Sequence, residues 1–447
     1  MTRIISIFAV LLAAIASLAT AHAAPAQRFF ATMPFAETPF TDVTGIHPMS
    51  EVEAQTRKHF RFTYDAEGRV TRVAFMQGDE VVALNDSANY YFFAPQLVIS
   101  YEEGIERRQF LDIHGNRITV AGDVFEEEYE FDARGYRKQL TFKGMDGQPV
   151  ANSWDVVRYE WQLLDDGELI EKRYRFDGEL AELRGGFPFY EVRFQFGPNG
   201  FLSLMRNFGL ESELAMNSMN AAQDRLEYNA AGDLLSWNVL DVEGRYSRGN
   251  GPNVARGLLE RDSRGYEIAE HYQDEHGNPI ENAYGFAFTR KKNDRFGNLV
   301  EATNHELGGG ALMVSSSRGY AGYRAIFDEA GRNRLVVEFF DANREPVVRA
   351  GRSYARIRSE FDAHDNEIAT NYEDMDGALV NREDTGFARI ERDYDERGRL
   401  VESRFLDAQG QLVDHSRAGY AVERRTYGDH GVAVMMVRLT ADGEVHS

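Results

Sequence analysis

Short runs in which apolar and polar residues alternate fill most of the chain, and turn-forming residues separate the runs at regular distances. In the run 399–406, for example, Val401, Ser403 and Phe405 share one face of an extended chain. Alternation with a period of two, in runs too short for an ordinary helix, is typical of β-strands. The pattern therefore predicts an all-β protein.

The runs are separated by the motif Asp-x-x-Gly, which an aromatic residue often precedes. An Asp side chain at the first position accepts a backbone hydrogen bond from two residues further on, and Gly at the fourth position adopts a positive φ without strain. The two residues together predict a type I turn with a bulge, which is a hairpin connection. The motif or a close variant begins at Tyr64, Phe131, Tyr228, Arg261, Asn293, Phe327, Phe361 and Tyr394.

In the C-terminal half these turns follow one another in steps of 32 to 34 residues, which is the mark of a repeat architecture. A second turn follows the first by about twelve residues, and a Gly-aromatic-Ala sequence follows the second turn. We expect ten to twelve such units, each of about 33 residues, to form an elongated antiparallel, solenoid-like sheet with short capping helices. We expect the turns to be shaped by Asp262, Gly265, Asp274, Gly277, Asp328, Gly331, Asp395, Gly398, Asp407 and Gly410. The rings expected to stack unit on unit are Phe327, Phe361, Tyr394 and Tyr427.

The repeat does not cover the whole chain evenly. Residues 24–58 are expected to form an N-terminal capping segment, in which Ser50 and Glu53 form a capping box before a short helix. Residues 59–447 form the repeat domain, with an irregular middle at about 184–224. Within that middle, residues 211–224 have the composition of a helix. A glycine- and serine-rich insertion occupies residues 304–317.

The turn sequences YDERGRL (394–400) and YDAEGRV (64–70) resemble the YD repeat of the RHS family of bacterial surface and toxin-shell proteins. The resemblance covers one turn per unit, although the repeats of that family are shorter and its chains much longer. The two-turn unit ending in Gly-Tyr-Ala is similar to repeats in exported bacterial proteins and, more loosely, to MORN-type and WG-type repeats. The resemblance implies a β-sheet shell or solenoid with a binding or structural role, and it carries over no catalytic residue.

The first 23 residues have the pattern of a secretory signal peptide. Arg3 supplies the positive start, residues 4–19 the apolar stretch, and Ala21-His22-Ala23 the cleavage site. No later run approaches about 20 apolar residues, so we expect no membrane-spanning segment after the signal is removed. The pattern predicts a protein of the bacterial periplasm or the extracellular space.

The net charge and the lack of cysteine exclude several kinds of partner and site. The chain has 50 Lys and Arg against 72 Asp and Glu, a formal net charge of −22, which repels nucleic acids and anionic membrane surfaces. It has no Cys, so disulfides, a lipoprotein anchor, a cysteine nucleophile and thiolate metal sites are excluded.

Three polar clusters are candidate metal sites. Carboxylates at short spacing are the ligands that Ca²⁺ prefers, and neighbouring histidines suit transition metals. The clusters are Glu373, Asp374 and Asp376; Asp165, Asp166 and Glu168; and His271 with His276. A solvated turn explains each cluster better than a metal site does, and no cofactor is required.

No sequence motif of a known hydrolase or nucleotide-binding loop is present. Two ring-rich stretches, 89–93 and 187–190, are candidates for stacking on sugars or for holding a partner, although buried core or capping explains them better. We therefore expect an exported, non-catalytic binding or scaffolding protein of the cell envelope, with an envelope protein or a polysaccharide as partner. The alternatives are a carbohydrate-active hydrolase or lyase with acids in segments 184–224 or 304–317, and a Ca²⁺-dependent adhesin.

Overall fold

The computed structural model describes residues 26–84, 94–184, 187–428, 431 and 433–446, and in them it has 27 strands and one short helix. The ring-rich stretch 89–93 lies outside the described residues. The first half of the chain contains β1 (Ala26–Thr32), β2 (Ile46–Met49), α1 (Glu51–Ala54), β3 (Lys58–Tyr64), β4 (Val70–Gln77), β5 (Glu80–Val81), β6 (Gln96–Glu102), β7 (Ile105–Leu111), β8 (Glu126–Phe131), β9 (Arg137–Lys143), β10 (Arg158–Leu163), β11 (Leu169–Tyr174), β12 (Glu191–Phe196) and β13 (Leu202–Phe208). The second half contains β14 (Gln223–Tyr228), β15 (Leu234–Leu240), β16 (Arg256–Arg261), β17 (Glu267–Gln273), β18 (Phe288–Asn293), β19 (Leu299–His305), β20 (Gly322–Phe327), β21 (Arg334–Phe340), β22 (Arg356–Phe361), β23 (Glu367–Glu373), β24 (Arg389–Tyr394), β25 (Leu400–Leu406), β26 (Val422–Tyr427) and β27 (Ala433–Leu439).

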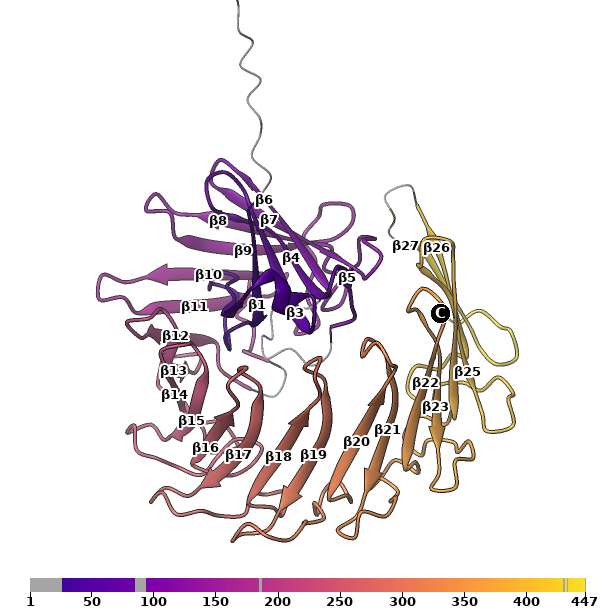
Figure 1. Ribbon diagram of the computed structural model, residues 1–447. Coiled ribbons are helices and arrows are strands. Elements are labelled where there is room, and N and C mark those ends of the chain that lie inside the picture. Colours follow the sequence, from indigo (N-terminus) through magenta and orange to yellow (C-terminus); the bar gives the residue numbers. More distant parts are fainter. Residues whose placement is uncertain (1–25, 85–93, 185–186, 429–430, 432, 447) are drawn as a thin grey trace, which may run out of the picture.

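All the strands belong to one antiparallel sheet, which confirms the predicted all-β repeat fold. β1 pairs with β2 and β3, β4 pairs with β3, β5 and β6, and from β6 onward each strand pairs with the next one in sequence. The sheet is open, because β2 and β27 form its two edges. Figure 1 shows that the strip of hairpins curls into a broad arc that brings the C-terminal hairpin back toward the N-terminal strands.

The hairpin between β24 and β25 illustrates the first turn of each unit. Asp395 Oδ1 accepts hydrogen bonds from the backbone N–H groups of Arg397 (2.9 Å) and Arg399 (3.0 Å). Gly398 adopts φ +73°, and the pairing register shifts by one residue just before the turn, between Asp393 and Tyr394. This is the geometry of a type I turn with a bulge. At Asp365, where the glycine is missing, the aspartate itself adopts φ +63°.

The second turn of each unit closes on a single bridge residue instead of a full strand. In the unit that contains β25, Asp407 N–H donates to the carbonyl of Gln411 (2.8 Å), and Leu406 pairs with Leu412. The chain then crosses to the next unit through the Gly-aromatic-Ala sequence, whose Ala421 is buried. At the crossing, Ser416 N–H donates to the Thr385 carbonyl of the preceding unit at 3.0 Å. Backbone hydrogen bonds therefore tie successive loops together at this end of the strands.

A column of aromatic rings forms the core of the C-terminal units, but its members differ from those predicted. Successive ring centroids lie 4.9 to 6.2 Å apart along Tyr320, Phe339, Tyr354, Tyr372, Phe387, Phe405 and Tyr420. Phe339, Tyr372 and Phe405 come from β21, β23 and β25, the second strands of their hairpins. The other rings come from the Gly-aromatic-Ala sequences or, at Tyr354, from the variant Ser-Tyr-Ala. The prediction that the rings of Phe327, Phe361, Tyr394 and Tyr427 stack unit on unit was wrong, and Tyr394 and Tyr427 show why. Because each follows the bulge, its hydroxyl instead donates to a backbone carbonyl of the preceding unit, that of Glu367 (3.0 Å) or Leu400 (2.7 Å).

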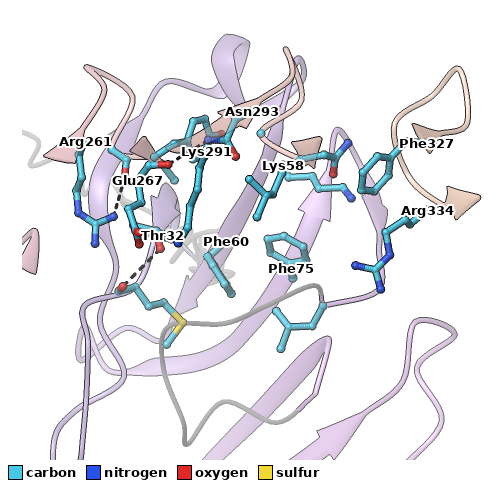
Figure 2. Close-up of a pocket in the computed structure, with 18 residues that line it drawn as sticks. Thr32, Lys58, Phe60, Phe75, Arg261, Glu267, Lys291, Asn293, Phe327 and Arg334 are labelled. Atoms are coloured by element: carbon cyan, nitrogen blue, oxygen red, sulfur yellow. Dashed lines mark hydrogen bonds and ion pairs between the residues drawn. The ribbon is translucent and has the colours of Figure 1, made fainter. Parts of the chain in front are cut away.

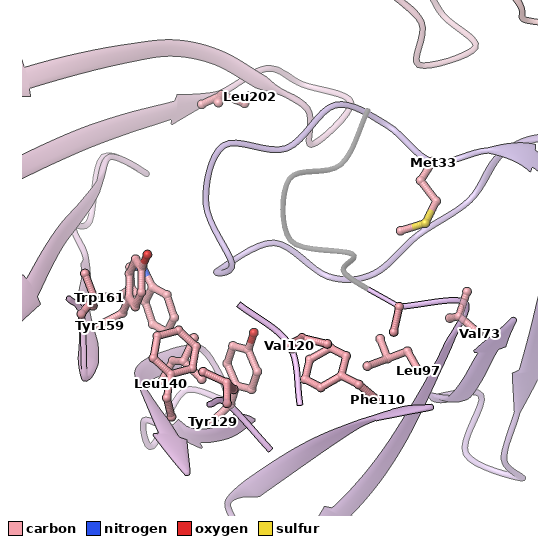
Figure 3. Close-up of a cluster of buried hydrophobic side chains, with 14 of the residues drawn as sticks. Met33, Val73, Leu97, Phe110, Val120, Tyr129, Leu140, Tyr159, Trp161 and Leu202 are labelled. Carbon is pink, nitrogen blue, oxygen red and sulfur yellow. The ribbon is translucent and has the colours of Figure 1, made fainter. Parts of the chain in front are cut away.

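The N-terminal half has a larger core, because an additional chain segment covers the sheet there. Residues 33–44, which we call the crossing segment, run across the sheet between β1 and β2. Its Met33 belongs to the same buried cluster as Leu97, Phe110 and Tyr159 (Figure 3). The Phe40 ring lies 5.6 Å from that of Trp161.

The predicted capping box is confirmed, since Ser50 and Glu53 bond reciprocally at the start of α1. The helix predicted at 211–224 was wrong. Residues 211–222 form turns and a bridge, because the Asn217 side chain accepts hydrogen bonds from the N–H groups of Met219 and Ala221 and so favours a turn over a helix. Within the described residues, no helix has the length and apolar character needed to cross a membrane.

Candidate functional site

A cavity of about 400 Å³ lies between the crossing segment and the sheet around β13, β14 and β15, and we call it the central pocket. Phe35 and Glu37 enter it from the crossing segment. Arg184 comes from the loop before β12, and Asp224 and Leu226 come from β14. The volume is within the range of small-molecule sites.

Glu37 and Arg184 form an ion pair within the pocket, and a side-chain hydrogen bond joins them. The Glu37 side chain keeps only 14% of its exposure. Burial raises the pKa of Glu37 to about 7, against the opposing effect of the Arg184 charge, and the nearby Asp224 carboxylate raises the pKa further. Near neutral pH this carboxyl group therefore exists in both protonation states.

Asp224 is the second acid of the central pocket. Its Oδ1 accepts a hydrogen bond from Asn250 Nδ2 at 3.1 Å. Burial raises the pKa of Asp224 to about 6, although the bond from Asn250 opposes the shift. Asp224 is therefore mainly ionised at neutral pH and acts there as a hydrogen-bond acceptor.

Asn207 supplies a further acceptor. The side chain is 1% exposed and lines the pocket, and its Nδ2 donates to the Ala222 carbonyl at 3.1 Å. Its Oδ1 has no hydrogen-bond partner within the described part of the chain. A buried acceptor without a partner is costly, so a donor on a bound molecule would be favourable here.

The walls of the pocket are mainly apolar. Phe187 and Phe189 line it, and both belong to the ring-rich stretch singled out in the sequence. Trp237 lines another side and is held in place by its Nε1, which donates to Glu270 at 2.9 Å. The arrangement offers aromatic surfaces together with one guanidinium and several oxygen acceptors. It can therefore hold a molecule that has both apolar faces and hydroxyl or amine groups.

The turn residues predicted from the motif do not line this pocket and lie in two rows at the opposite ends of the strands. Their glycines adopt positive φ, at Gly265 (+87°), Gly277 (+83°), Gly331 (+71°), Gly398 (+73°) and Gly410 (+78°). The aspartates of these turns, for example Asp262, Asp274 and Asp328, accept hydrogen bonds from backbone N–H groups of their own turns. The first row also makes contacts across the arc, since His114 Nε2 lies 2.6 Å from Asn366 Oδ1.

The candidate metal ligands do not gather around one point. Across the described residues, no group of three or more His, Asp or Glu side chains could hold an ion. Glu373 pairs with Arg358 at 2.8 Å, and Asp374 Oδ1 accepts the N–H groups of Asp376 and Ala378 in its own turn.

The other two clusters are similarly dispersed. Glu168 forms an ion pair with Arg206, while Asp166 Oδ1 accepts the Glu168 N–H at 3.1 Å in its own turn. His271 pairs with Glu260 at 3.0 Å, and the His276 N–H donates to Asp274. The dependence of the protein on Ca²⁺ stays a prediction.

Sequence reasoning did not find Glu37, Arg184 and Asp224 as a group. Residue 37 lies in a segment that was expected only to cap the repeat. Arg184 and Asp224 stand at the two ends of the segment 184–224, which the sequence did mark as irregular. The sequence did contain one signal of this site, because the irregular segment 184–224 also contains the aromatic residues at 187–190.

No protein-family model matches the chain, and no curated protein is significantly similar to it. Among solved structures, it is similar to one described as TcdB2-TccC3-TEV, with 12% identity and a TM-score of 0.30, over 89% of this chain and 20% of that one. It is also similar to a porin-like protein from Bacteroides uniformis, with 9% identity and a TM-score of 0.17, over 63% of this chain and 88% of that one. The chain thus spans about a fifth of the first of these structures. Its own geometry defines it as a β-hairpin repeat protein with a single open sheet.

Proposed function

We propose that the protein is an exported binding protein of the bacterial envelope, and that the central pocket binds a saccharide. The observation that carries the proposal is the grouping of Glu37, Asp224 and the unpartnered Asn207 Oδ1 among aromatic walls. Sugar hydroxyls donate to such acceptors, and the apolar face of a sugar ring packs on aromatic side chains. The resemblance of the turns to YD repeats also favours a binding or structural role.

Two polar side chains are expected to form the hydrogen bonds that recognise the saccharide. Asp224, with one bond from Asn250, can accept a hydrogen bond from a hydroxyl group of the ligand. Arg184, which is already oriented by Glu37, can donate to a ring or hydroxyl oxygen. A charge-assisted hydrogen bond of this kind is worth about 1.5 to 3 kcal/mol.

The test is a calorimetric titration of the protein, without residues 1–23, with neutral, N-acetylated and acidic mono- and disaccharides. We expect at least one of them to bind, and Asp224→Asn to weaken that binding at least tenfold. Asp376→Asn is the matched control, because Asp376 is exposed and lies outside the pocket. Equal affinities for the parent and Asp224→Asn would contradict the proposal.

A hydrolase is the second candidate, and the two carboxyl groups with raised pKa values in one pocket favour it. Glu37, with a pKa of about 7, can carry the proton that a leaving group needs, while Asp224 is mainly ionised. Prolonged incubation with the bound saccharide distinguishes the two functions. Cleavage that is lost in both Glu37→Gln and Asp224→Asn would establish the enzyme, whereas recovery of intact saccharide supports binding alone.

Export is proposed from the sequence of residues 1–23. We expect the full chain, expressed in a bacterium, to be recovered from the periplasm or the medium with a mass that corresponds to a start near Ala24. Recovery of the uncleaved chain from the cytoplasm would contradict this part of the proposal.

A further inference from the structure

A second cavity, of about 260 Å³, lies where the arc closes on itself, and we call it the seam pocket (Figure 2). Its walls come from β1, β3 and β4 near the N-terminus and from units that contain β16 to β21. The two sides are joined directly, because the Lys58 N–H donates to the Phe296 carbonyl at 2.9 Å.

Lys58 is a buried cation without a carboxylate partner. The residue is 5% exposed, and no ion pair joins it to any residue that the structure describes. Its ammonium group has one hydrogen bond, to the Arg332 carbonyl at 3.3 Å, and lies 5.3 Å from the centroid of the Phe327 ring. Burial lowers the pKa of Lys58 to about 8. An ammonium group has three donors, so two remain for another partner.

The nearby carboxylates are committed to their own turns. Asp294 and Asp328 act on Lys58 only through their charges. Asp294 accepts hydrogen bonds from the N–H groups of Phe296 and Asn298. Asp328 accepts them from the N–H groups of Arg332 and Asn333. Neither of them neutralises the ammonium group by contact.

Arg334 is the second cation at this end of the pocket. Figure 2 shows its guanidinium on the same side as the Lys58 ammonium and the Phe327 ring, and its positive charge contributes to the lowered pKa of Lys58. Arg334 is exposed, and it too has no ion-pair partner among the residues described.

The cations at the opposite end already have acidic partners. Lys291 pairs with Glu267 at 2.6 Å. Arg261 donates to the Gly265 carbonyl at 3.1 Å and lies 3.6 Å from Asp233. The unneutralised charge of the seam pocket is therefore concentrated at Lys58 and Arg334.

The surface between the two ends is apolar. Phe60 and Phe75 line it, with ring centroids 4.9 Å apart, and Met33 of the crossing segment completes it. Such a surface suits a hydrocarbon group, at roughly 25 cal/mol per Å² of apolar surface removed from water.

We propose that the seam pocket binds an amphipathic organic anion, whose carboxylate or phosphate head lies between Lys58 and Arg334 and whose apolar body packs on Phe60 and Phe75. The site is separate from the central pocket, and the inference does not depend on the saccharide proposal. Because Lys58 belongs to β3 and Arg334 to β21, the ligand would also tie the N-terminal strands to the unit that contains β21.

The experiment is a calorimetric titration with three probes of equal chain length, namely octanoate, octyl phosphate and octyltrimethylammonium. We expect one or both anions to bind and the cation not to bind. Binding of octanoate alone identifies a carboxylate head, and binding of octyl phosphate alone identifies a phosphate head. Binding of the cation as tightly as the anions, or the absence of binding by all three, would overturn the proposal.

Arg334→Gln is the informative variant, since Arg334 is exposed and its replacement leaves the core intact. We expect it to weaken anion binding at least tenfold and to abolish the rise in melting temperature that the anion causes in the parent. Arg397→Gln, at an exposed turn position, is the matched control. Unchanged anion affinity in Arg334→Gln would refute the site, while unchanged affinity in Asp224→Asn is expected and separates the two pockets.

Discussion

A single glycine of the turn motif can be required both by the backbone of its own hairpin and by a contact with a distant hairpin across the arc. Gly398 adopts φ +73°, and a Cβ atom placed there would overlap the ring of His114, which comes from the hairpin after β7. Gly410 has a similar φ, +78°, but an added Cβ would have nothing within 4 Å. The two positions therefore share the backbone requirement and differ in the contact.

This difference gives a matched pair of substitutions. We expect Gly410→Val to lower the free energy of unfolding by about 1 to 3 kcal/mol through backbone strain alone. Gly398→Val should cost more, because the new side chain also displaces His114 from Asn366. Urea unfolding measures both effects. An unchanged stability in both variants would contradict the turn geometry, and equal losses would contradict the contact across the arc.

The acids of the central pocket make stability depend on pH in a defined direction. Because the pKa of Glu37 is raised from 4.5 to about 7 on folding, its stabilising contribution is complete below pH 4.5 and is lost as the pH rises through 7. We expect Glu37→Gln to gain on the parent by on the order of 2 kcal/mol between pH 4.5 and pH 8. Urea unfolding at both pH values is the measurement. A constant difference between the two proteins would show that Glu37 has an ordinary pKa.

At the scale of the elements, the aromatic column gives the C-terminal units their shared core. Each inner ring touches one from its own unit and one from a neighbouring unit, so the column couples units as well as strands. Phe387 is 2% exposed, and its centroid lies 5.8 Å from that of Tyr372 and 4.9 Å from that of Phe405. Loss of this ring should therefore be felt in both of the units that it joins.

We expect Phe387→Ala to lower the free energy of unfolding by about 3 to 5 kcal/mol, the usual cost of removing a buried ring. Phe176→Ala is the control, since Phe176 is 66% exposed and its loss should change stability by less than about 0.5 kcal/mol. Urea unfolding monitored by circular dichroism compares them. Similar losses in the two variants would contradict the role of the column.

The hairpins could be predicted because their information is local. Asp395 and Gly398 shape a turn through bonds that span four residues, so their spacing alone was sufficient. The members of the ring column were not predictable in the same way. The bulge before each turn shifts the register, and it redirects Tyr394 toward a carbonyl of the preceding unit. The sequence motif alone does not show how that shift orients a side chain.

At the scale of the whole molecule, the curl of the sheet and the crossing segment create both pockets. The crossing segment carries Glu37 to Arg184, 147 residues away, and the curl carries Lys58 to Arg332, 274 residues away. Neither of these two long-range contacts is indicated by a periodic pattern in the sequence. The sequence predicted the repeat and marked the irregular segment 184–224, but the sites depend on how the sheet bends and on what lies across it.

The central claim is that the central pocket holds a saccharide, and the most direct measurement is a crystal structure of the protein with the tightest-binding saccharide of the titration. The account predicts density between the crossing segment and β14, with sugar hydroxyls within hydrogen-bond distance of Asp224 and Asn207 and a ring face on Phe187 or Trp237. A saccharide seated elsewhere on the sheet, with the central pocket empty, would contradict it.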